Sequence, residues 1–164
     1  MDMLKRILSF VLISIIICFS TSCTNQDQKS EIEKVESFAK NNDSDIQIVC
    51  DYLLNTQYHY ASIESVSGKM YVMFEYIDIK DPTVNDSIKT LWKENCKQIA
   101  LDTSCNAISF LLGRSAFDER DYGLVYPINN TSEINVEFQT ELVPLDNNKY
   151  YYYVSDYNKW RLSR

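Results

Sequence analysis

The spacing of apolar residues switches along this chain between a helical period and a period of two, and this order limits the folds that it can adopt. Helical spacing predicts helices over 31–55 and from 85 or 86 to about 100. Alternation predicts strands over 58–66, 70–79, 107–112, 122–128, 133–143 and 149–155. Helices followed by a hairpin, a helix and a run of strands indicate an α+β fold. We expect an antiparallel sheet of about five to seven strands with helices packed on one face.

Local signals predict where the helices begin. Ser30 with Glu33 and Ser44 with Gln47 form two capping boxes, which indicate two short helices in tandem or one bent helix. For the next helix, Asn85 or Asp86 is the expected cap. Its apolar face would comprise Ile88, Leu91, Trp92, Cys96, Ile99 and Ala100.

Two strand signals carry further detail. Ser67 and Gly68 predict the turn of a hairpin between strands 58–66 and 70–79. The stretch 133–143 alternates regularly, which is typical of a strand with one solvated face. Its expected buried side comprises Ile134, Val136, Phe138 and Leu142.

The first 22 residues have the layout of a secretory signal peptide. Lys5 and Arg6 precede an apolar run over residues 7–19, and small residues follow it. The run has 13 residues, whereas a membrane-spanning helix needs roughly 20. We therefore expect residues 1–22 to be removed, residues 23–30 to form a polar tether, and residues 31–164 to form a single globular α+β domain.

Residues Ser20, Thr21, Ser22 and Cys23 resemble the lipobox of bacterial lipoproteins. The resemblance implies cleavage before Cys23, a diacylglycerol on its sulfur and acylation of the new amino end, with palmitate as an expected chain. Ser20 departs from the pattern, since the family prefers leucine there. Ser20 and Ser22 also satisfy the rule for ordinary secretory cleavage, so that alternative stays open. Thr24 after the cysteine resembles the residue that directs enteric lipoproteins to the outer membrane.

Charge and cysteine content limit the classes of partner and the number of disulfides that are possible. Losing residues 1–22, with two basic residues and one acidic residue, takes the net charge from −7 to −8. An acidic body is a poor ligand for nucleic acid, so we expect no nucleic-acid partner. We expect attachment to a membrane through the lipid anchor. Cys50, Cys96 and Cys105 remain if Cys23 is lipidated, which allows at most one disulfide. We favour three small, buried apolar residues.

No catalytic, cofactor or metal motif is present in the sequence. His59 stands alone among tyrosines, without a local carboxylate or nucleophile to form a catalytic group. The loop 117–121 gathers charge, including Asp118, Glu119 and Asp121, but lacks the spacing of a calcium loop. A solvated loop is the simpler interpretation. We expect no cofactor and no enzymatic activity, and the alternative is a small hydrolase that uses these carboxylates.

Twelve tyrosines are the most suggestive feature of the body. Tyr58 and Tyr60 would share one face of a strand, as would Tyr151 and Tyr153, with Trp160 nearby. Exposed rows of this kind stack against a glycan or a protein partner, whereas the alternative is packing across the sheet. The sequence thus predicts an envelope lipoprotein with a non-catalytic binding domain, inhibitor-like or immunity-like in role. A structural envelope subunit is a further alternative.

Overall fold

The structure is a computed structural model that describes residues 28–114, 120–129, 134–136, 138–145 and 148–156. The chain divides into two compact units, Met1–Lys34 and Val35–Arg164. In the first unit the described residues, 28–34, are helical. The second unit contains the whole sheet, and its fold is α+β as the sequence predicts. Among the described residues, no helix has the length and apolar character needed to cross a bilayer.

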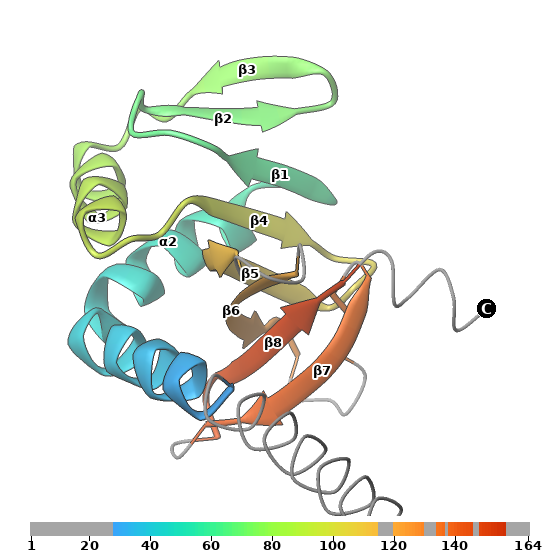
Figure 1. Cartoon of the computed structure of the whole chain (residues 1–164). Helices are drawn as coiled ribbons and strands as arrows, with labels where there is room; N and C mark the ends of the chain where they lie inside the picture. Colours follow the sequence, from blue (N-terminus) through green and yellow to red (C-terminus); the bar gives the residue numbers. More distant parts are fainter. Residues whose placement is uncertain (1–27, 115–119, 130–133, 137, 146–147, 157–164) are drawn as a thin grey trace, which may run out of the picture. The chain divides into compact units, whose positions relative to one another are not determined.

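The sheet has eight strands, in the order β3-β2-β1-β4-β5-β6-β8-β7, and every neighbouring pair is antiparallel (Figure 1). The count exceeds the expected five to seven because one predicted strand is split and another was assigned to a helix. The strands are β1 Tyr60–Ile63, β2 Lys69–Val72, β3 Glu75–Asp78, β4 Gln98–Asp102, β5 Ala107–Arg114, β6 Asp121–Pro127, β7 Gln139–Pro144 and β8 Tyr151–Ser155.

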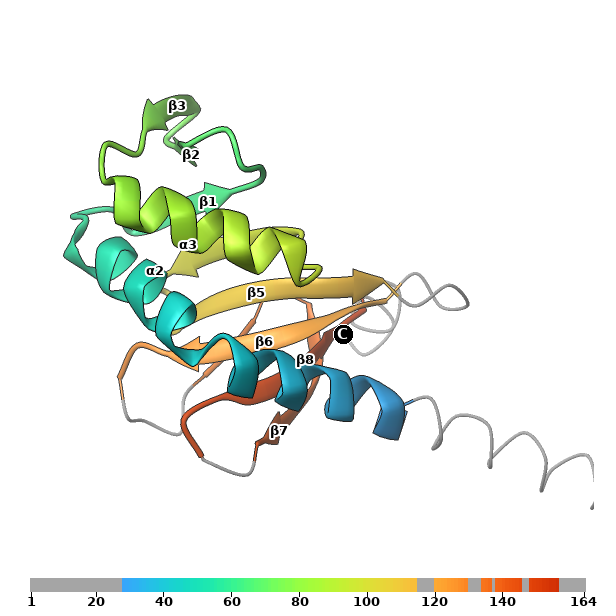
Figure 2. The same cartoon turned by 90° about the vertical axis from the view of Figure 1, so that its left-hand side faces the viewer.

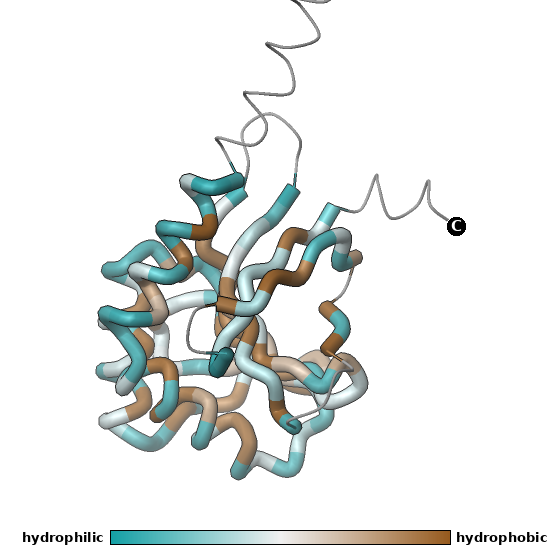
Figure 3. Tube along the Cα trace, turned by 90° about the horizontal axis from the view of Figure 1, so that it is seen from below, coloured by the Kyte–Doolittle hydropathy of each residue, from teal (hydrophilic) through white to brown (hydrophobic). Residues whose placement is uncertain are grey.

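Helices α2 (Asp43–Asn55) and α3 (Pro82–Lys93) lie side by side on one face of this sheet, as predicted (Figure 2). Apolar and polar segments alternate along the helical part of the trace (Figure 3). The apolar positions point inward: Ile46, Val49, Cys50 and Leu53 of α2 are buried, as are Val84, Ile88 and Leu91 of α3.

One row of paired residues forms the centre of the core beneath the helices. Ile63, Ile99, Phe110, Leu124 and Tyr152 are each fully buried, and each is the direct cross-strand neighbour of the next. Directly paired residues of antiparallel strands share a face. Burying one such side chain contributes about 1.5–3 kcal/mol relative to leaving it exposed. This row therefore fixes which face of β1, β4, β5, β6 and β8 turns towards the helices.

The predicted caps of α2 and α3 are both wrong, and Ser30 of the first predicted box lies within the helical segment 28–41. The side chain of Asp81 caps α3, accepting hydrogen bonds from the backbone N–H groups of Thr83 (2.8 Å) and Val84 (3.4 Å), with Pro82 in the first turn. Proline at this position needs no hydrogen-bond partner for its nitrogen, which makes Asp81–Pro82 the stronger start signal. Asn42 precedes α2, so the predicted box of Ser44 and Gln47 lies inside the helix.

Helix α3 also ends earlier than its apolar spacing predicts. The chain leaves the helix after Lys93, and Asn95 adopts a left-handed conformation (φ 73°), in which asparagine is tolerated. Ile99 and Ala100, assigned to the helix from their spacing, belong to β4. The apolar spacing continued across the break because Ile99 of β4 is buried in the same core as Leu91 of α3.

The predicted strand 70–79 is interrupted by a two-residue turn. Val72 of β2 pairs with Glu75 of β3, which leaves Met73 (φ 48°) and Phe74 (φ 73°) as the loop. Two positive φ values define the type I′ hairpin turn, which normally contains Asn-Gly. For an ordinary L-residue this conformation costs roughly 1–2 kcal/mol, so the turn is strained.

The predicted strand 133–143 begins later than expected. Strand β7 covers only Gln139–Pro144. Ile134 and Val136 lie outside the strand but still pack against the sheet, on a cluster of Ala107, Val125 and Tyr153. Their apolar pattern thus reflects burial beneath an irregular segment.

The three described cysteines form no disulfide with one another. Cys50 and Cys96 are buried, as predicted, whereas Cys105 is half-buried. Burial raises the pKa of Cys50 and raises that of Cys96 to about 12. Both of these thiols therefore stay protonated and unreactive at physiological pH.

Asp43 joins α2 to the start of β8. Its Oδ1 accepts hydrogen bonds from Lys149 Nζ and from the hydroxyl of the buried Tyr150, each at 2.6 Å. The hydrogen bond from Lys149 and then that from Tyr150 lower the pKa of Asp43, although burial opposes them. The carboxylate is therefore preferentially stabilised in its ionised form.

We expect Asp43→Asn to reduce the free energy of unfolding by about 1 kcal/mol at pH 7, the upper range for a partly exposed pair. Because folding lowers this pKa, the contribution is complete above the unfolded value of 3.8 and is lost as pH falls through the folded value. Urea unfolding of wild type and variant from pH 2 to 7 should show the difference vanish at the acid end. Asp45→Asn, in the same helical turn, is the control. A difference that persists at pH 2 would contradict the assignment.

Candidate functional site

The face of the sheet opposite the helices, here called the open face, can be identified from the strand register. A row of direct neighbours crosses the sheet on this face, out of phase with the buried row under the helices. It comprises Tyr76, Tyr71, Ser62, Ala100, Ser109, Val125 and Tyr151. Side chains that alternate along a strand point to opposite faces, so the whole row points away from α2 and α3.

The open face is hollow because its middle is built from small residues. Ala100 and Ser109 are direct neighbours on β4 and β5, and Ala107 lies two positions before Ser109. Tyrosines stand at both ends of the row, Tyr71 and Tyr76 on one side and Tyr151 on the other. A small-residue floor between large side chains leaves a depression.

This depression is a pocket of about 250 Å³, here called the central pocket. Its floor comes from β4 and β5, and Tyr60 of β1 forms one wall. The opposite wall comes from β8 and the segment before β7. The lining residues are Tyr60, Gln98, Ala100, Asp102, Cys105, Ala107, Ser109, Leu111, Asp121, Asn135, Val136, Phe138, Tyr153 and Ser155.

The segment before β7 is held in place as a wall by hydrogen bonds. The backbone N–H of Asn135 donates to the carbonyl of Cys105 (3.0 Å), and that of Val136 donates to Gln139 Oε1 (2.9 Å). The N–H of Asp156 donates to the carbonyl of Phe138 (3.0 Å). The wall is therefore tied to the β4–β5 turn and to the end of β8.

The acidic side of the central pocket is Asp102. Its Oδ1 accepts from the hydroxyl (2.6 Å) and N–H (2.9 Å) of Ser104, and its Oδ2 accepts from the thiol of Cys105 (3.2 Å). Burial alone would raise the pKa of Asp102, but these hydrogen bonds outweigh it and lower the pKa. Asp102 is therefore ionised at neutral pH and orders the turn that ends β4.

Asp121, the second carboxylate of the central pocket, is held by an ion pair. Arg114 Nε donates to its Oδ1 at 2.9 Å, and a terminal guanidinium nitrogen donates to its Oδ2 at 3.4 Å. The two residues are direct neighbours at the ends of β5 and β6. This two-point contact directs both oxygens of Asp121 towards the arginine.

A second pocket, of about 320 Å³, lies beside the β2–β3 turn and is here called the hairpin pocket. It is lined by Gln57, Tyr58, His59, Tyr60, Tyr71, Met73 and Phe74, none of which is an acid, lysine or arginine. Tyr60 lines both pockets, so they adjoin on the open face. His59 Nδ1 lies 3.1 Å from Thr103 Oγ1, which ties this segment to the β4–β5 turn.

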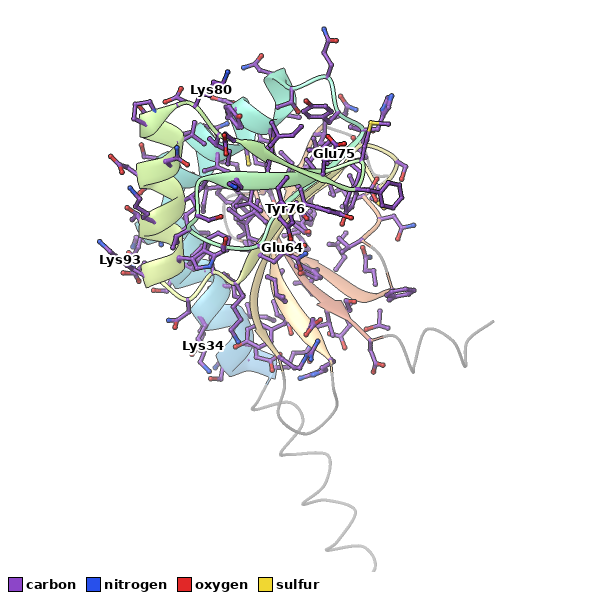
Figure 4. All side chains as sticks on the ribbon, turned by 90° about the horizontal axis from the view of Figure 1, so that it is seen from above. Lys34, Glu64, Glu75, Tyr76, Lys80 and Lys93 are labelled. Atoms are coloured by element: carbon purple, nitrogen blue, oxygen red, sulfur yellow. The ribbon has the colours of Figure 1, made fainter. Side chains whose placement is uncertain are left out.

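Glu64 lies beside the exposed ring of Tyr76. It accepts hydrogen bonds from the buried Ser62 hydroxyl (3.1 Å) and from the Tyr76 hydroxyl (3.5 Å). The rings of Tyr71 and Tyr76 pack with their centroids 5.2 Å apart. Figure 4 shows Glu64, Tyr76 and Glu75 together along the β2–β3 hairpin, with Lys80 and Lys93 at the ends of α3.

The structure brings several of the sequence-predicted partner residues together. Tyr60, Tyr153 and Asp121 line the central pocket, and Tyr58 lines the hairpin pocket with Tyr60. Tyr60 is 47% exposed, whereas Tyr153 is only 4% exposed and packs against Ala107 and Val125 with Tyr151. Tyr151 and Tyr153 therefore pack across the sheet, as in the alternative interpretation, whereas the ring of Tyr60 is exposed to a partner.

Other predicted residues lie outside the described residues. These are the lipidation candidate Cys23, the loop carboxylates Asp118 and Glu119, and Trp160. In the described part of the chain, His, Cys, Asp and Glu residues form no group of three that could hold a metal ion.

Sequence reasoning missed the hairpin tip and the small-residue floor. Met73 and Phe74 continue the apolar run that begins at Met70, and neither is a typical turn residue, so the sequence hides the turn. Ala100 and Ser109 carry no signal alone, since only the register makes them neighbours.

Comparison of the chain with protein-family models, with curated proteins and with solved structures gave no match.

Proposed function

We propose that this chain is a lipid-anchored protein of the bacterial cell envelope whose folded domain binds a protein or a glycan without catalysing a reaction. The anchor rests on the signal-peptide layout and on Cys23, which follows Ser20, Thr21 and Ser22 as in a lipobox. Placement in the outer membrane rests on Thr24. A polar stretch after Cys23 would let the domain stand away from the bilayer.

The observation that carries the binding role is the hollow open face. Its pockets adjoin at Tyr60, an exposed aromatic side chain with a polar tip. Aromatic side chains beside a preformed depression are typical of protein and carbohydrate recognition sites. Helices α2 and α3 lie on the other face of the sheet, so neither covers this one (Figure 1).

The state of Asp121, the one described carboxylate of the hydrolase alternative, favours binding, and Asp102 of the same pocket is engaged in a similar way. Asp102 is engaged by Ser104 and Cys105, and Asp121 is engaged by Arg114. A general acid or base needs an oxygen directed at the substrate, whereas these oxygens are directed at neighbouring groups of the chain. The negative charge of Asp102 instead suits a cationic or hydrogen-bonding ligand.

The test is affinity capture with three baits, each in the form that the cells produce: wild type, Ser109→Trp and Ser37→Trp. The first variant fills the central pocket, and the second places the same side chain at an exposed position of the helical segment 28–41. Envelope extract and culture supernatant are applied at low and high salt, and a glycan array is probed in parallel. We expect one ligand retained by wild type and Ser37→Trp and lost with Ser109→Trp. No ligand in either format, or equal retention by all three baits, would refute the proposal.

A further inference from the structure

The tip of the β2–β3 hairpin exposes two large apolar side chains. Met73 is 81% exposed and Phe74 is 91% exposed, the highest values among the large apolar residues of the described chain. Both have positive φ values, which bulky residues rarely adopt. Backbone strain at exposed apolar residues adds nothing to folding, and such strain is concentrated at sites of recognition.

The exposed tip is joined to a concave surface. Met73 and Phe74 line the hairpin pocket together with Tyr58, Tyr60 and Tyr71. Its volume of about 320 Å³ lies at the lower end of the range for small ligand sites, which suits one large side chain. Projecting apolar residues beside an aromatic pocket have the form of a hot spot in a protein interface.

A carboxylate stands on the same face of the sheet as this pocket. Glu64 is exposed and lies beside Tyr76 of the open-face row, whereas Glu75 pairs with Val72 and points to the opposite face. Among the described residues, Glu64 takes part in no ion pair. A complementary surface would therefore place a basic group next to its apolar side chain.

The charge pattern discriminates between possible occupants. A second copy that packed on this pocket about a two-fold axis close to Glu64 would bring that carboxylate towards its own copy, which is repulsive. Anionic lipids repel an acidic body, which disfavours a bilayer as the occupant. A flat bilayer also leaves a concave pocket unfilled.

We propose that the Met73–Phe74 turn and the hairpin pocket bind an apolar side chain of a protein partner that has a lysine or arginine next to it, facing Glu64. This inference rests on the proposed function, because it assigns a partner class to the binding domain.

The test uses phage-displayed random 12-residue peptides, selected on the protein in the form that its cells produce. Selected peptides are then synthesised and titrated against four proteins: wild type, Phe74→Ser, Val66→Ser and the double variant Met73→Asn with Phe74→Gly. Val66 is 48% exposed in the β1–β2 loop, away from the tip, and is the matched control. The double variant keeps the turn type with its preferred residues, so it should melt at a higher temperature than wild type while lacking the apolar tip.

We expect selected peptides to carry an aromatic or large aliphatic residue within two positions of a lysine or arginine. Affinity should fall at least tenfold with Phe74→Ser and with the double variant, and should change less than twofold with Val66→Ser. Peptides without this pattern, no selected peptide, or equal binding to Phe74→Ser would overturn the inference. Ser109→Trp is titrated alongside these four proteins. If it lost binding while Phe74→Ser and the double variant kept it, the inference would be overturned and the proposed function would stand. Vesicles of phosphatidylethanolamine and phosphatidylglycerol that bind Cys23→Ala protein, but not Cys23→Ala with Phe74→Ser, would point to lipid instead.

Discussion

Replacement of Cys23 by alanine should move the protein from the membrane fraction to the soluble fraction. Each buried acyl methylene contributes about 0.8 kcal/mol to membrane binding, and two or more chains give a stable anchor. The net charge of −7 offers no second attachment to anionic lipid. Ser20 and Ser22 still permit ordinary cleavage in the variant. Cell fractionation with immunoblotting measures the distribution, and intact-mass analysis measures the lipid.

The matched control is Cys18→Ala, which changes the other cysteine of the amino-terminal segment. Cys18 lies inside the segment that is expected to be removed, so its variant should remain in the membrane with the full lipid mass. Mature Cys23→Ala protein that stays in the membrane fraction would disprove the lipid anchor.

Replacement of Gly123 by alanine should lower the free energy of unfolding by about 3 kcal/mol, the upper range for overpacking a core. A Cβ atom on Gly123 would overlap the carbonyl oxygen of Phe110 on the neighbouring strand and would lie 2.9 Å from the ring of Tyr153. A backbone carbonyl within the β5–β6 ladder cannot rotate away. Urea unfolding monitored by circular dichroism gives the free-energy difference.

Gly113→Ala provides the comparison for this prediction. There the three atoms nearest the added Cβ all belong to the side chain of Tyr122, which is half-buried and can shift. We expect this variant to be destabilised less than Gly123→Ala. If the order of the two were reversed, the close approach of Gly123 to Phe110 would not control stability here.

The helical parts of the fold were largely predictable because helix α2 displays its buried face in the sequence. Ile46, Val49, Cys50 and Leu53 recur at helical spacing and all are buried. The ends of the helices were harder to predict. Helix α3 is ended by Asn95 in a left-handed conformation, whereas the helical spacing of apolar residues continues into β4. The spacing of apolar residues indicates which positions are buried. Buried positions continue when the chain changes from helix to strand in the same core, so the spacing does not show where the helix ends.

The candidate site was predictable only in part, because it depends on contacts between distant strands. Tyr58 and Tyr60 were predicted to share one face of a strand; Tyr58 lies outside β1, but both residues line the hairpin pocket. The tip was missed because Met73 and Phe74 lack the glycine or asparagine that normally marks a type I′ turn. The central pocket was missed because strand register decides which small residues become neighbours.

The most direct test of the open face as a binding surface is photo-cross-linking in living cells with p-benzoylphenylalanine in place of Tyr60. Tyr60 is 47% exposed and lines both pockets. The same group in place of Leu54, 37% exposed on α2, serves as the control on the helical layer. We predict a discrete cross-linked species of higher mass at position 60 that is absent at position 54. No adduct at position 60, or the same adduct at both positions, would contradict a binding role for the open face.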